Sequence, residues 1–176
     1  MHNKDLQMSE IQFVDTVVSV RRVTKVTKGG KRFSFSAFVV SGDQQGAVGC
    51  GQGKGREVSA AISKATALAR KNLIAISVRE NTLPYDVQGH HGATNVLLRS
   101  AYKGTGLIAG KSVRAVMLAL GVKDVLAKTL GPSRSPQNVV KATLNALAKC
   151  RSVHHIAKLR GKTVAAITKG ESTHVA

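Results

Sequence analysis

The chain has 176 residues, of which 27 are Lys or Arg and only nine are Asp or Glu, so its formal net charge is +18. Self-repulsion at this charge destabilises an isolated compact protein and indicates a polyanionic partner, against the alternative of a merely solvated basic surface. Cys50 and Cys150 lie far apart outside any CxxC motif, and no apolar run reaches the length of a membrane span, which argues against a disulfide scaffold, a zinc module and a membrane protein.

The first half of the chain predicts three strands followed by one helix. Loose alternation over 12–27 predicts a strand that bends near its basic end, and the Gly29-Gly30 pair supplies a turn because glycine tolerates positive φ. Two further strands are expected at 33–39 and 47–54, and apolar residues at helical spacing predict a helix from about Arg56 to Ala75. The expected unit is an antiparallel βββα domain.

The second half predicts a βαβα domain that begins after a linker at Asn81–Pro84. Short strands at 85–91 and 94–100 precede a glycine loop, a helix ending at Gly121 and a strand at 122–130. Ser135 is the expected N-cap of a last helix, with Pro136 in its first position. The whole is an α+β protein with a flexible tail at 1–10, domains at 11–80 and 85–160, and a basic tail at 161–176.

The segment from Arg21 to Arg32 carries the strongest functional signal. Six of its twelve positions are basic and none is acidic, and the double glycine lies among them. Clustered cations beside a tight turn are typical of phosphate contact. A solvated hairpin edge that prevents aggregation is the weaker alternative.

The next signal is a ladder of alternating glycines, at positions 49, 51, 53 and 55. All four lie on one face of the predicted strand, where the absence of side chains lets another backbone approach closely. That backbone belongs either to RNA or to the helix packed on its own sheet, and the sequence leaves both interpretations open. The spacing does not fit a nucleotide P-loop.

A second glycine loop, Gly104-Thr105-Gly106-Leu107-Ile108-Ala109, fits a short dinucleotide-binding pattern, with Asp124 at a plausible distance for a ribose contact. A nucleotide-binding enzyme built on Gly104–Ser112 is therefore the alternative function, although the chain is short for it. A glycine-rich turn, or a helix N-terminus that holds an RNA phosphate, also explains the pattern. We expect no catalytic residues, no cofactor and no metal, since the histidine pairs lack further ligands at suitable spacing.

Three segments together resemble the bacterial-type small-subunit (30S) ribosomal protein five family. They are RRVTKVTKGGKRFSFSAFVVSGDQQGAVGCGQGKGREVSAAISKA, YKGTGLIAGKSVRAV and VKDVLAKTLGPSRSPQNVVKATLNAL. The likeness extends from about Val14 to Gly161. It departs from the usual family pattern at a few positions, which are Cys50, Gln52, Tyr85, Ser100 and Ser135.

The resemblance implies a double-stranded-RNA-binding-like first domain and a structural, non-enzymatic role in the cytoplasmic small subunit. The protein would bind 16S-type ribosomal RNA between body and head, contact small-subunit proteins four and eight, and line the messenger entry with protein three, which links it to decoding accuracy. The turn at 24–31 corresponds to the loop associated with spectinomycin sensitivity. The RNA-binding positions implied are Arg21, Arg22, Lys25, Lys28, Gly29, Gly30, Lys31, Arg32, Lys54, Arg56 and Lys64. The protein-interface positions are Gly104, Thr105 and Gly106, near protein four, and Asn138 and Lys141, in the domain that contacts protein eight.

Overall fold

A computed structural model describes residues 12–79, 81–131 and 135–169, which divide into two compact units. The first unit contains the chain up to Ile74 together with Ala115–Gly121, and the second contains Ala75–Arg114 and the chain from Val122 onward. Both units combine a four-stranded sheet with helices, so the predicted α+β class is confirmed. No helix in the described ranges is long and apolar enough to span a bilayer.

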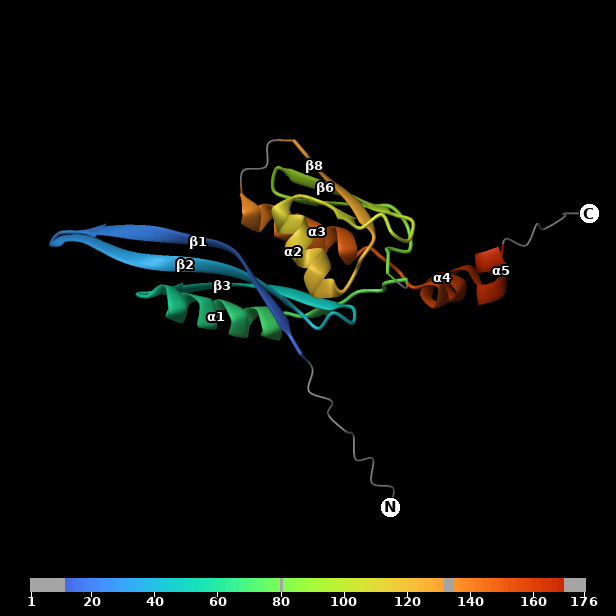
Figure 1. The fold of residues 1–176 in the computed structure, drawn as a ribbon, viewed down its shortest axis with the longest axis horizontal. Coiled ribbons are helices and arrows are strands. Elements are labelled where there is room, and N and C mark those ends of the chain that lie inside the picture. Colours follow the sequence, from blue (N-terminus) through green and yellow to red (C-terminus); the bar gives the residue numbers. More distant parts are fainter. Residues whose placement is uncertain (1–11, 80, 132–134, 170–176) are drawn as a thin grey trace, which may run out of the picture. The chain divides into compact units, whose positions relative to one another are not determined.

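The first unit contains a sheet in the order β1-β2-β3-β4 with α1 against one face (Figure 1). Its elements are β1 (Val14–Thr27), β2 (Gly30–Gly42), β3 (Ala47–Gly55), α1 (Val58–Lys71) and β4 (Ile74–Ala75). The predicted helix end at Ala75 is wrong, because α1 stops at Lys71, Asn72 caps it, and the next residues form β4. The rest of the βββα order is as expected.

The glycines of β3 make room for α1. A Cβ added at Gly51 would lie 2.2 Å from the Ala65 carbonyl oxygen, and one added at Gly53 would lie 2.2 Å from the Ala61 carbonyl oxygen. Small residues therefore face each other across the helix–sheet interface, and Ala61, Ala65 and Ala69 are fully buried. Of the two interpretations of the ladder, the structure supports close packing of the helix, which leaves this face no room for RNA.

A register shift in β1 decides which side chains share a face of the sheet. Val17 pairs with Val39 but Ser19 pairs with Phe38, so Val18 is an additional residue in β1. Such a bulge reverses the in–out alternation of every residue beyond it. The irregularity lies at this position rather than near the basic end, where the sequence analysis placed a bend.

The second unit contains a sheet in the order β5-β6-β8-β7, in which β7 is parallel to β8. Its elements are β5 (Val87–His91), β6 (Thr94–Ser100), β7 (Leu107–Ile108), β8 (Val125–Leu130), α3 (Pro136–Leu147), α4 (Val153–Arg160) and α5 (Val164–Lys169). Gly89 allows α3 to approach β5 closely, as the glycines of β3 do for α1, since a Cβ there would lie 2.4 Å from the Ala142 carbonyl oxygen of α3. Three elements, β7, α4 and α5, were not predicted, because they are short or weakly patterned in the sequence.

Two predicted boundary features differ in detail. Ser135 is the N-cap residue of α3 and Pro136 follows it, but the Ser135 hydroxyl makes no capping hydrogen bond. The segment Asn81–Pro84 is not a free linker. Leu83 is buried, and the Asn81 carbonyl accepts hydrogen bonds from the backbone of Lys123 and Asp124.

The predicted βαβα order places helix α2 (Lys111–Leu120) wholly in the second unit. In the structure only its first residues belong to that unit. Its C-terminal half lies in the first unit, where the Ala119 carbonyl accepts a hydrogen bond of 3.0 Å from the Gln44 backbone. A Cβ at Gly42 would lie 2.2 Å from the same carbonyl oxygen, so glycine is needed there for close approach. The buried apolar residues of this half of α2, among them Val116 and Met117, therefore belong to the first unit.

Candidate nucleic-acid interface

The basic segment folds as the end of the β1–β2 hairpin. Thr27 and Gly30 are its last paired residues, Lys28 and Gly29 form the turn between them, and the Thr27 hydroxyl donates a hydrogen bond of 3.0 Å to the Gly30 carbonyl. Gly30 has a φ of +125°, which requires glycine, whereas Gly29 is not in the positive-φ region. The tight turn projects the flanking cations into solvent.

Within β2, only Phe35–Gly42 pair with β3. The part of the β1–β2 hairpin nearer the turn therefore continues beyond the sheet as a two-stranded ribbon (Figure 1). On the side of the ribbon away from α1, Lys25 lies directly opposite Arg32. These two residues, together with Lys54 and Arg56, line a hollow of about 840 Å³, which we call the basic hollow. Its other lining residues are Val23, Thr24, Phe33 and Ser34.

The electrostatics of the basic hollow favour an anion from outside the chain. No lining residue is acidic, and like charges placed directly opposite each other on neighbouring strands are destabilising. The two ion pairs formed among the described residues involve Arg70 with Asp15 and Arg99 with Asp86, and neither pair touches the hollow. Bound phosphates would remove the repulsion that the free protein carries.

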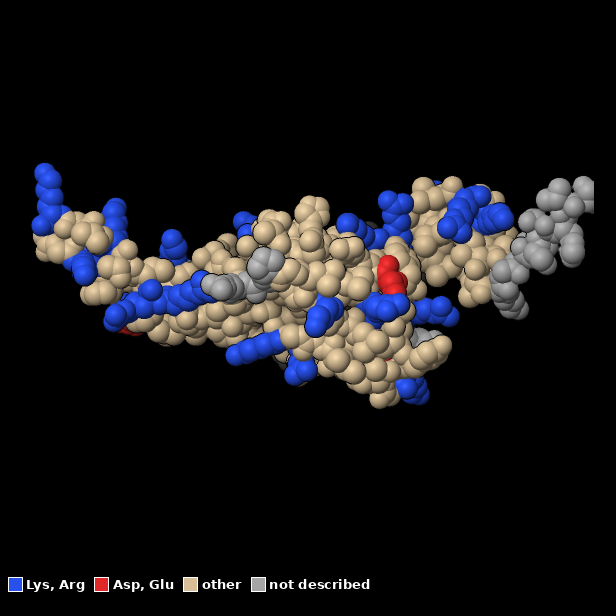
Figure 2. Space-filling model, turned by 90° about the horizontal axis from the view of Figure 1, so that it is seen from above, with Lys and Arg blue, Asp and Glu red and all other residues tan. Residues whose placement is uncertain are grey.

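The remaining predicted RNA-binding positions are exposed, and none of them lines the hollow. Arg22 lies on the other side of the ribbon, with its guanidinium carbon 4.6 Å from the centre of the Phe33 ring. Lys31 pairs with Val26 on that same side, Lys28 is in the turn, and Lys64 is on α1. Figure 2 shows Lys and Arg side chains along the ribbon, with little acidic surface between them.

The second glycine loop is organised around a buried carboxylate. Asp124 is 5% exposed, and its Oδ1 accepts hydrogen bonds from the backbone of Gly104, at 3.0 Å, and of Gly106, at 2.9 Å. A loop whose N–H groups already bind an internal anion cannot offer them to a pyrophosphate. Asp124 is therefore a structural residue and not a ribose ligand, which removes the basis for the nucleotide-binding alternative. Thr105 stays exposed at the surface of this rigid loop.

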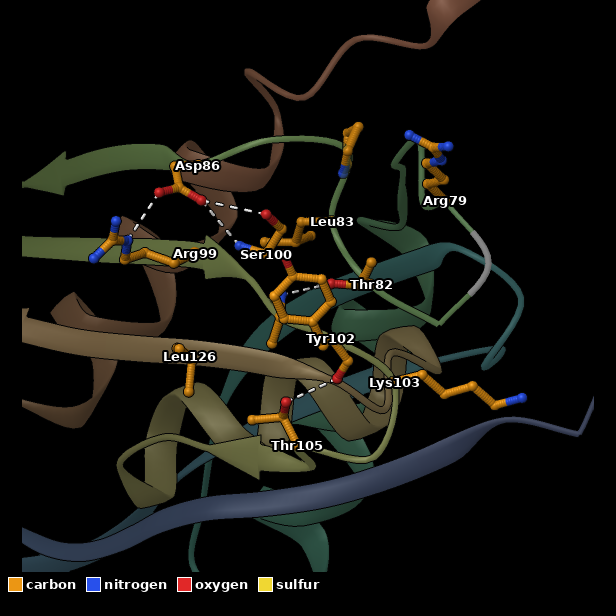
Figure 3. A pocket seen from close by; sticks show the side chains of 12 residues that line it. Arg79, Thr82, Leu83, Asp86, Arg99, Ser100, Tyr102, Lys103, Thr105 and Leu126 are labelled. Carbon is orange, nitrogen blue, oxygen red and sulfur yellow. Dashed lines mark hydrogen bonds and ion pairs between the residues drawn. The ribbon is translucent and has the colours of Figure 1, made fainter. Parts of the chain in front are cut away.

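A second hollow, of about 760 Å³, lies beside this loop within the second unit (Figure 3). Tyr102 is at its rim with 92% of its surface exposed, and Lys103 and Thr105 also line it. On its other side are Arg99 and Ser100, the last residues of β6. The hollow therefore brings the predicted protein-interface loop next to an exposed aromatic side chain.

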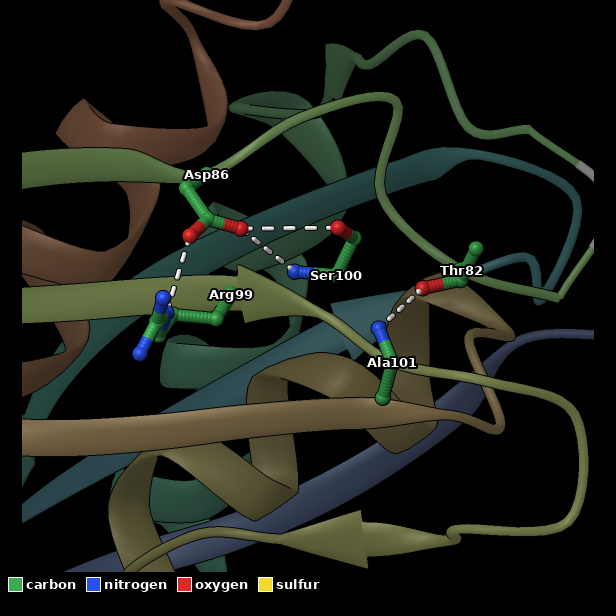
Figure 4. A network of polar contacts seen from close by, with 5 residues as sticks. All are labelled: Thr82, Asp86, Arg99, Ser100 and Ala101. Atoms are coloured by element: carbon green, nitrogen blue, oxygen red, sulfur yellow. Dashed lines mark hydrogen bonds and ion pairs between the residues drawn. The ribbon is translucent and has the colours of Figure 1, made fainter.

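Asp86 fixes the wall of this second hollow (Figure 4). Its carboxylate accepts hydrogen bonds from Arg99 Nε at 2.8 Å and from the Ser100 backbone at 3.0 Å. The Arg99 hydrogen bond and then that from Ser100 hold the pKa of Asp86 below its usual value of 3.8. Thr82 braces the same region, because its hydroxyl donates to the Asp124 carbonyl and accepts from the Ala101 backbone.

The sequence matches two profiles of one protein family in consecutive parts of the chain. Residues 13–77 match "Ribosomal protein S5, N-terminal domain" and residues 89–160 match "Ribosomal protein S5, C-terminal domain". The chain belongs to the ribosomal protein S5 family.

Individual relatives are similar over most of their length to this S5-family chain. A protein of Paramagnetospirillum magneticum named "Small ribosomal subunit protein uS5" is 52% identical over 162 residues, covering 92% of this chain and 77% of the relative. Proteins of the same name from Lawsonia intracellularis and Granulibacter bethesdensis are 50% and 54% identical. They cover 93% and 88% of this chain, and 100% and 81% of the relatives, respectively.

Membership of the S5 family confirms the resemblance seen in the sequence and the prediction of a structural ribosomal protein rather than an enzyme. Of the two predicted protein-interface positions on α3, Asn138 is half-buried and Lys141 is exposed. Among the residues that the structure describes, no three His, Cys, Asp or Glu side chains come together as metal ligands.

Sequence reasoning missed two residues of functional interest. Phe33 was predicted only as the first residue of a strand, with no functional role, and it is 50% exposed on the ribbon. Its exposure follows from the length of the unsupported hairpin, because β3 ends its pairing at Phe35. Asp124 was considered as a ligand contact, and only the backbone path of the loop shows that it binds the loop itself.

Proposed function

We propose that this chain is a ribosome-bound, cytoplasmic constituent of the small ribosomal subunit that binds 16S-type ribosomal RNA through the basic hollow and the turn of the ribbon. The observation that carries this proposal is the hollow itself, where Lys25, Arg32, Lys54 and Arg56 meet without an acidic residue. Cations fixed on a sheet neutralise phosphates and release counterions, which favours binding to a structured RNA. The named relatives are small-subunit proteins, which agrees with this role.

The same proposal assigns further contacts to the surfaces of the second unit. The loop Gly104–Gly106 would contact small-subunit protein four, and the region of Asn138 and Lys141 would contact protein eight. The loop is suited to a protein contact because Asp124 holds its backbone rigid while Thr105 and Tyr102 remain exposed. In this arrangement the chain stabilises the body–head region, lines the messenger entry with protein three and contributes to decoding accuracy.

The RNA-binding surface is tested by measuring the affinity of the full chain for a small-subunit ribosomal RNA fragment across a series of salt concentrations. Each of Lys25→Gln, Arg32→Gln and Lys54→Gln removes one phosphate contact, so each lowers the slope of log K against log salt by about 1. Lys123→Gln is the matched control, because Lys123 is exposed and lies outside the hollow. Equal losses in the control and the hollow variants would contradict this assignment.

A further inference from the structure

The two faces of the ribbon differ chemically. Beyond Phe35 the hairpin has no third strand, so both faces of its last residues are open to solvent. One face, with Lys25 and Arg32, leads into the basic hollow. Thr24 and Phe33 also border the hollow, but the register of the strands places their side chains on the opposite face. The opposite face, which we call the Phe33 face, carries a mixture of apolar, polar and cationic side chains, namely Arg22, Thr24, Val26, Lys31 and Phe33.

The Phe33 face exposes apolar surface that no part of the described chain covers. Val26 is 72% exposed and the Phe33 side chain is 50% exposed, although both lie on a strongly basic ribbon. Phosphate contact alone would need neither side chain. Apolar side chains kept in water beside cations indicate a ligand that has an apolar face and a negative charge nearby.

On this face the Arg22 guanidinium lies over the ring of Phe33, and we call the two the Arg22–Phe33 pair. They lie on adjacent strands, diagonal to each other across the ladder, and the guanidinium carbon of Arg22 is 4.6 Å from the ring centre of Phe33. Unpaired RNA bases stack on aromatic rings and on guanidinium planes, and here the two groups are already in contact. A nucleobase that stacks on the Arg22 guanidinium would extend this contact.

We propose that the Phe33 face binds one unpaired RNA base, which stacks on the Arg22–Phe33 pair while the basic hollow on the other face contacts backbone phosphates. This inference rests on the proposed RNA-binding function, and it adds a means by which the protein distinguishes RNA with an unpaired base from a perfect duplex. A perfect duplex contacts only the basic hollow. An RNA with a bulged or looped-out base satisfies both faces of the ribbon.

The test uses the full chain and two synthetic RNA hairpins whose strands are joined by a hexaethylene glycol linker in place of a nucleotide loop, so that the perfect hairpin has no unpaired base. The two hairpins are identical except for one extra 2-aminopurine nucleotide bulged from the stem of one of them. A stem of about 16 base pairs suits a fold of the double-stranded-RNA-binding type. We expect the wild type to bind the bulged hairpin at least about fivefold more tightly than the perfect one, since stacking on an aromatic side chain adds that much or more. The 2-aminopurine fluorescence should fall on binding as the base stacks.

The decisive variant is Phe33→Leu, which keeps apolar volume but removes the aromatic ring. It should abolish both the preference for the bulged hairpin and the fluorescence change, while the salt dependence of binding, which the cations of the hollow determine, stays as in the wild type. Phe33→Tyr should retain the preference, and Val26→Ala, on the same face, is the control for loss of apolar surface alone. Circular dichroism establishes that each variant is folded.

Equal affinity of the wild type for the two hairpins, with salt-dependent binding intact, would overturn the stacking inference and leave the proposed RNA-binding function standing. An equal loss of Phe33→Leu affinity for both hairpins would also overturn it, by showing that the ring supports the ribbon or contacts another partner. Failure of the wild type to bind either RNA would contradict the proposed function itself.

Discussion

At the scale of single residues, glycine and alanine determine how closely α1 approaches its sheet. Gly51 and Ala65 meet backbone to backbone, and a methyl group at Gly51 would lie 2.2 Å from a carbonyl oxygen that belongs to the helix. The helix backbone cannot yield locally as a flexible side chain could. These glycines thus contribute to stability, and RNA does not reach them.

We expect Gly51→Ala to destabilise the folded chain by about 1–3 kcal/mol, the usual range for an overpacked core. Urea unfolding of the free protein measures this loss. Gly29→Ala is the matched control, because a Cβ there meets nothing within 4 Å and its φ is outside the positive region. If Gly51→Ala left stability unchanged and weakened only RNA binding, the packing interpretation would be wrong.

Asp86 provides a second residue-scale prediction, in which acid removes a stabilising contact. Because Arg99 and Ser100 lower its pKa in the folded state, the carboxylate stabilises the fold above its unfolded value of 3.8, and the contribution disappears as pH falls through the lower folded pKa. The contribution is small, since the Asp86 side chain is 46% exposed.

Carboxyl titration by NMR should therefore give Asp86 a pKa below 3.8 in the wild type, and Arg99→Leu should raise it towards that value. Arg70→Leu removes the other ion pair and should leave the titration of Asp86 unchanged. A wild-type pKa at or above 3.8 would show that Arg99 and Ser100 do not hold the carboxylate in solution.

At the scale of elements, the loop between β6 and α2 depends on one carboxylate, that of Asp124, which directly precedes β8. Charge-assisted hydrogen bonds are stronger than neutral ones, and Asp124 accepts two of them while buried. These hydrogen bonds hold the backbone of the loop in one conformation, although glycine residues by themselves would make it flexible.

Asp124→Asn should lower the free energy of unfolding by about 1–3 kcal/mol, because a neutral amide replaces the buried acceptor and adds an N–H group without a partner. The comparison is Asp43→Asn, where Oδ1 also accepts from two backbone groups, of Gln45 and Ala47, but in a more exposed turn. We expect the smaller loss there. Equal losses measured by urea unfolding would argue against burial as the reason that Asp124 matters.

The elements also show how far the sequence predicts this structure. Helical spacing locates α1 and α3, because each buries a regular apolar face. Alternation also locates β1–β3, although no residue of β1 is fully buried and the buried face of β3 consists of glycines. Short elements such as β4 and β7 carry too few residues for a pattern, and their existence depends on neighbouring strands. The bulge at Val18 has no signal in the sequence. The register set at the Thr27–Gly30 turn, which the sequence also does not define, places Arg22 on the Phe33 face and Lys25 in the basic hollow.

At the scale of the whole molecule, charge and family agree on one role. The acidic residues Asp15, Asp43, Asp86 and Asp124 all bind groups of the chain itself, whereas the basic hollow has no acidic residue in its lining. Positive charge is therefore left available for a polyanion. The composition of the sequence predicts a polyanionic partner. The surface that would bind it, the basic hollow, could be located only once the register of the strands was known.

The most direct test of the account is sucrose-gradient sedimentation of a cell lysate, with the chain detected in each fraction before and after a high-salt wash. We expect the wild type to remain with small ribosomal subunits after the wash, and a Lys25→Glu, Arg32→Glu variant to be depleted from them while staying folded. Migration of the wild type at the top of the gradient, free of subunits, would contradict a role as a ribosomal constituent and favour a free-standing RNA-binding protein.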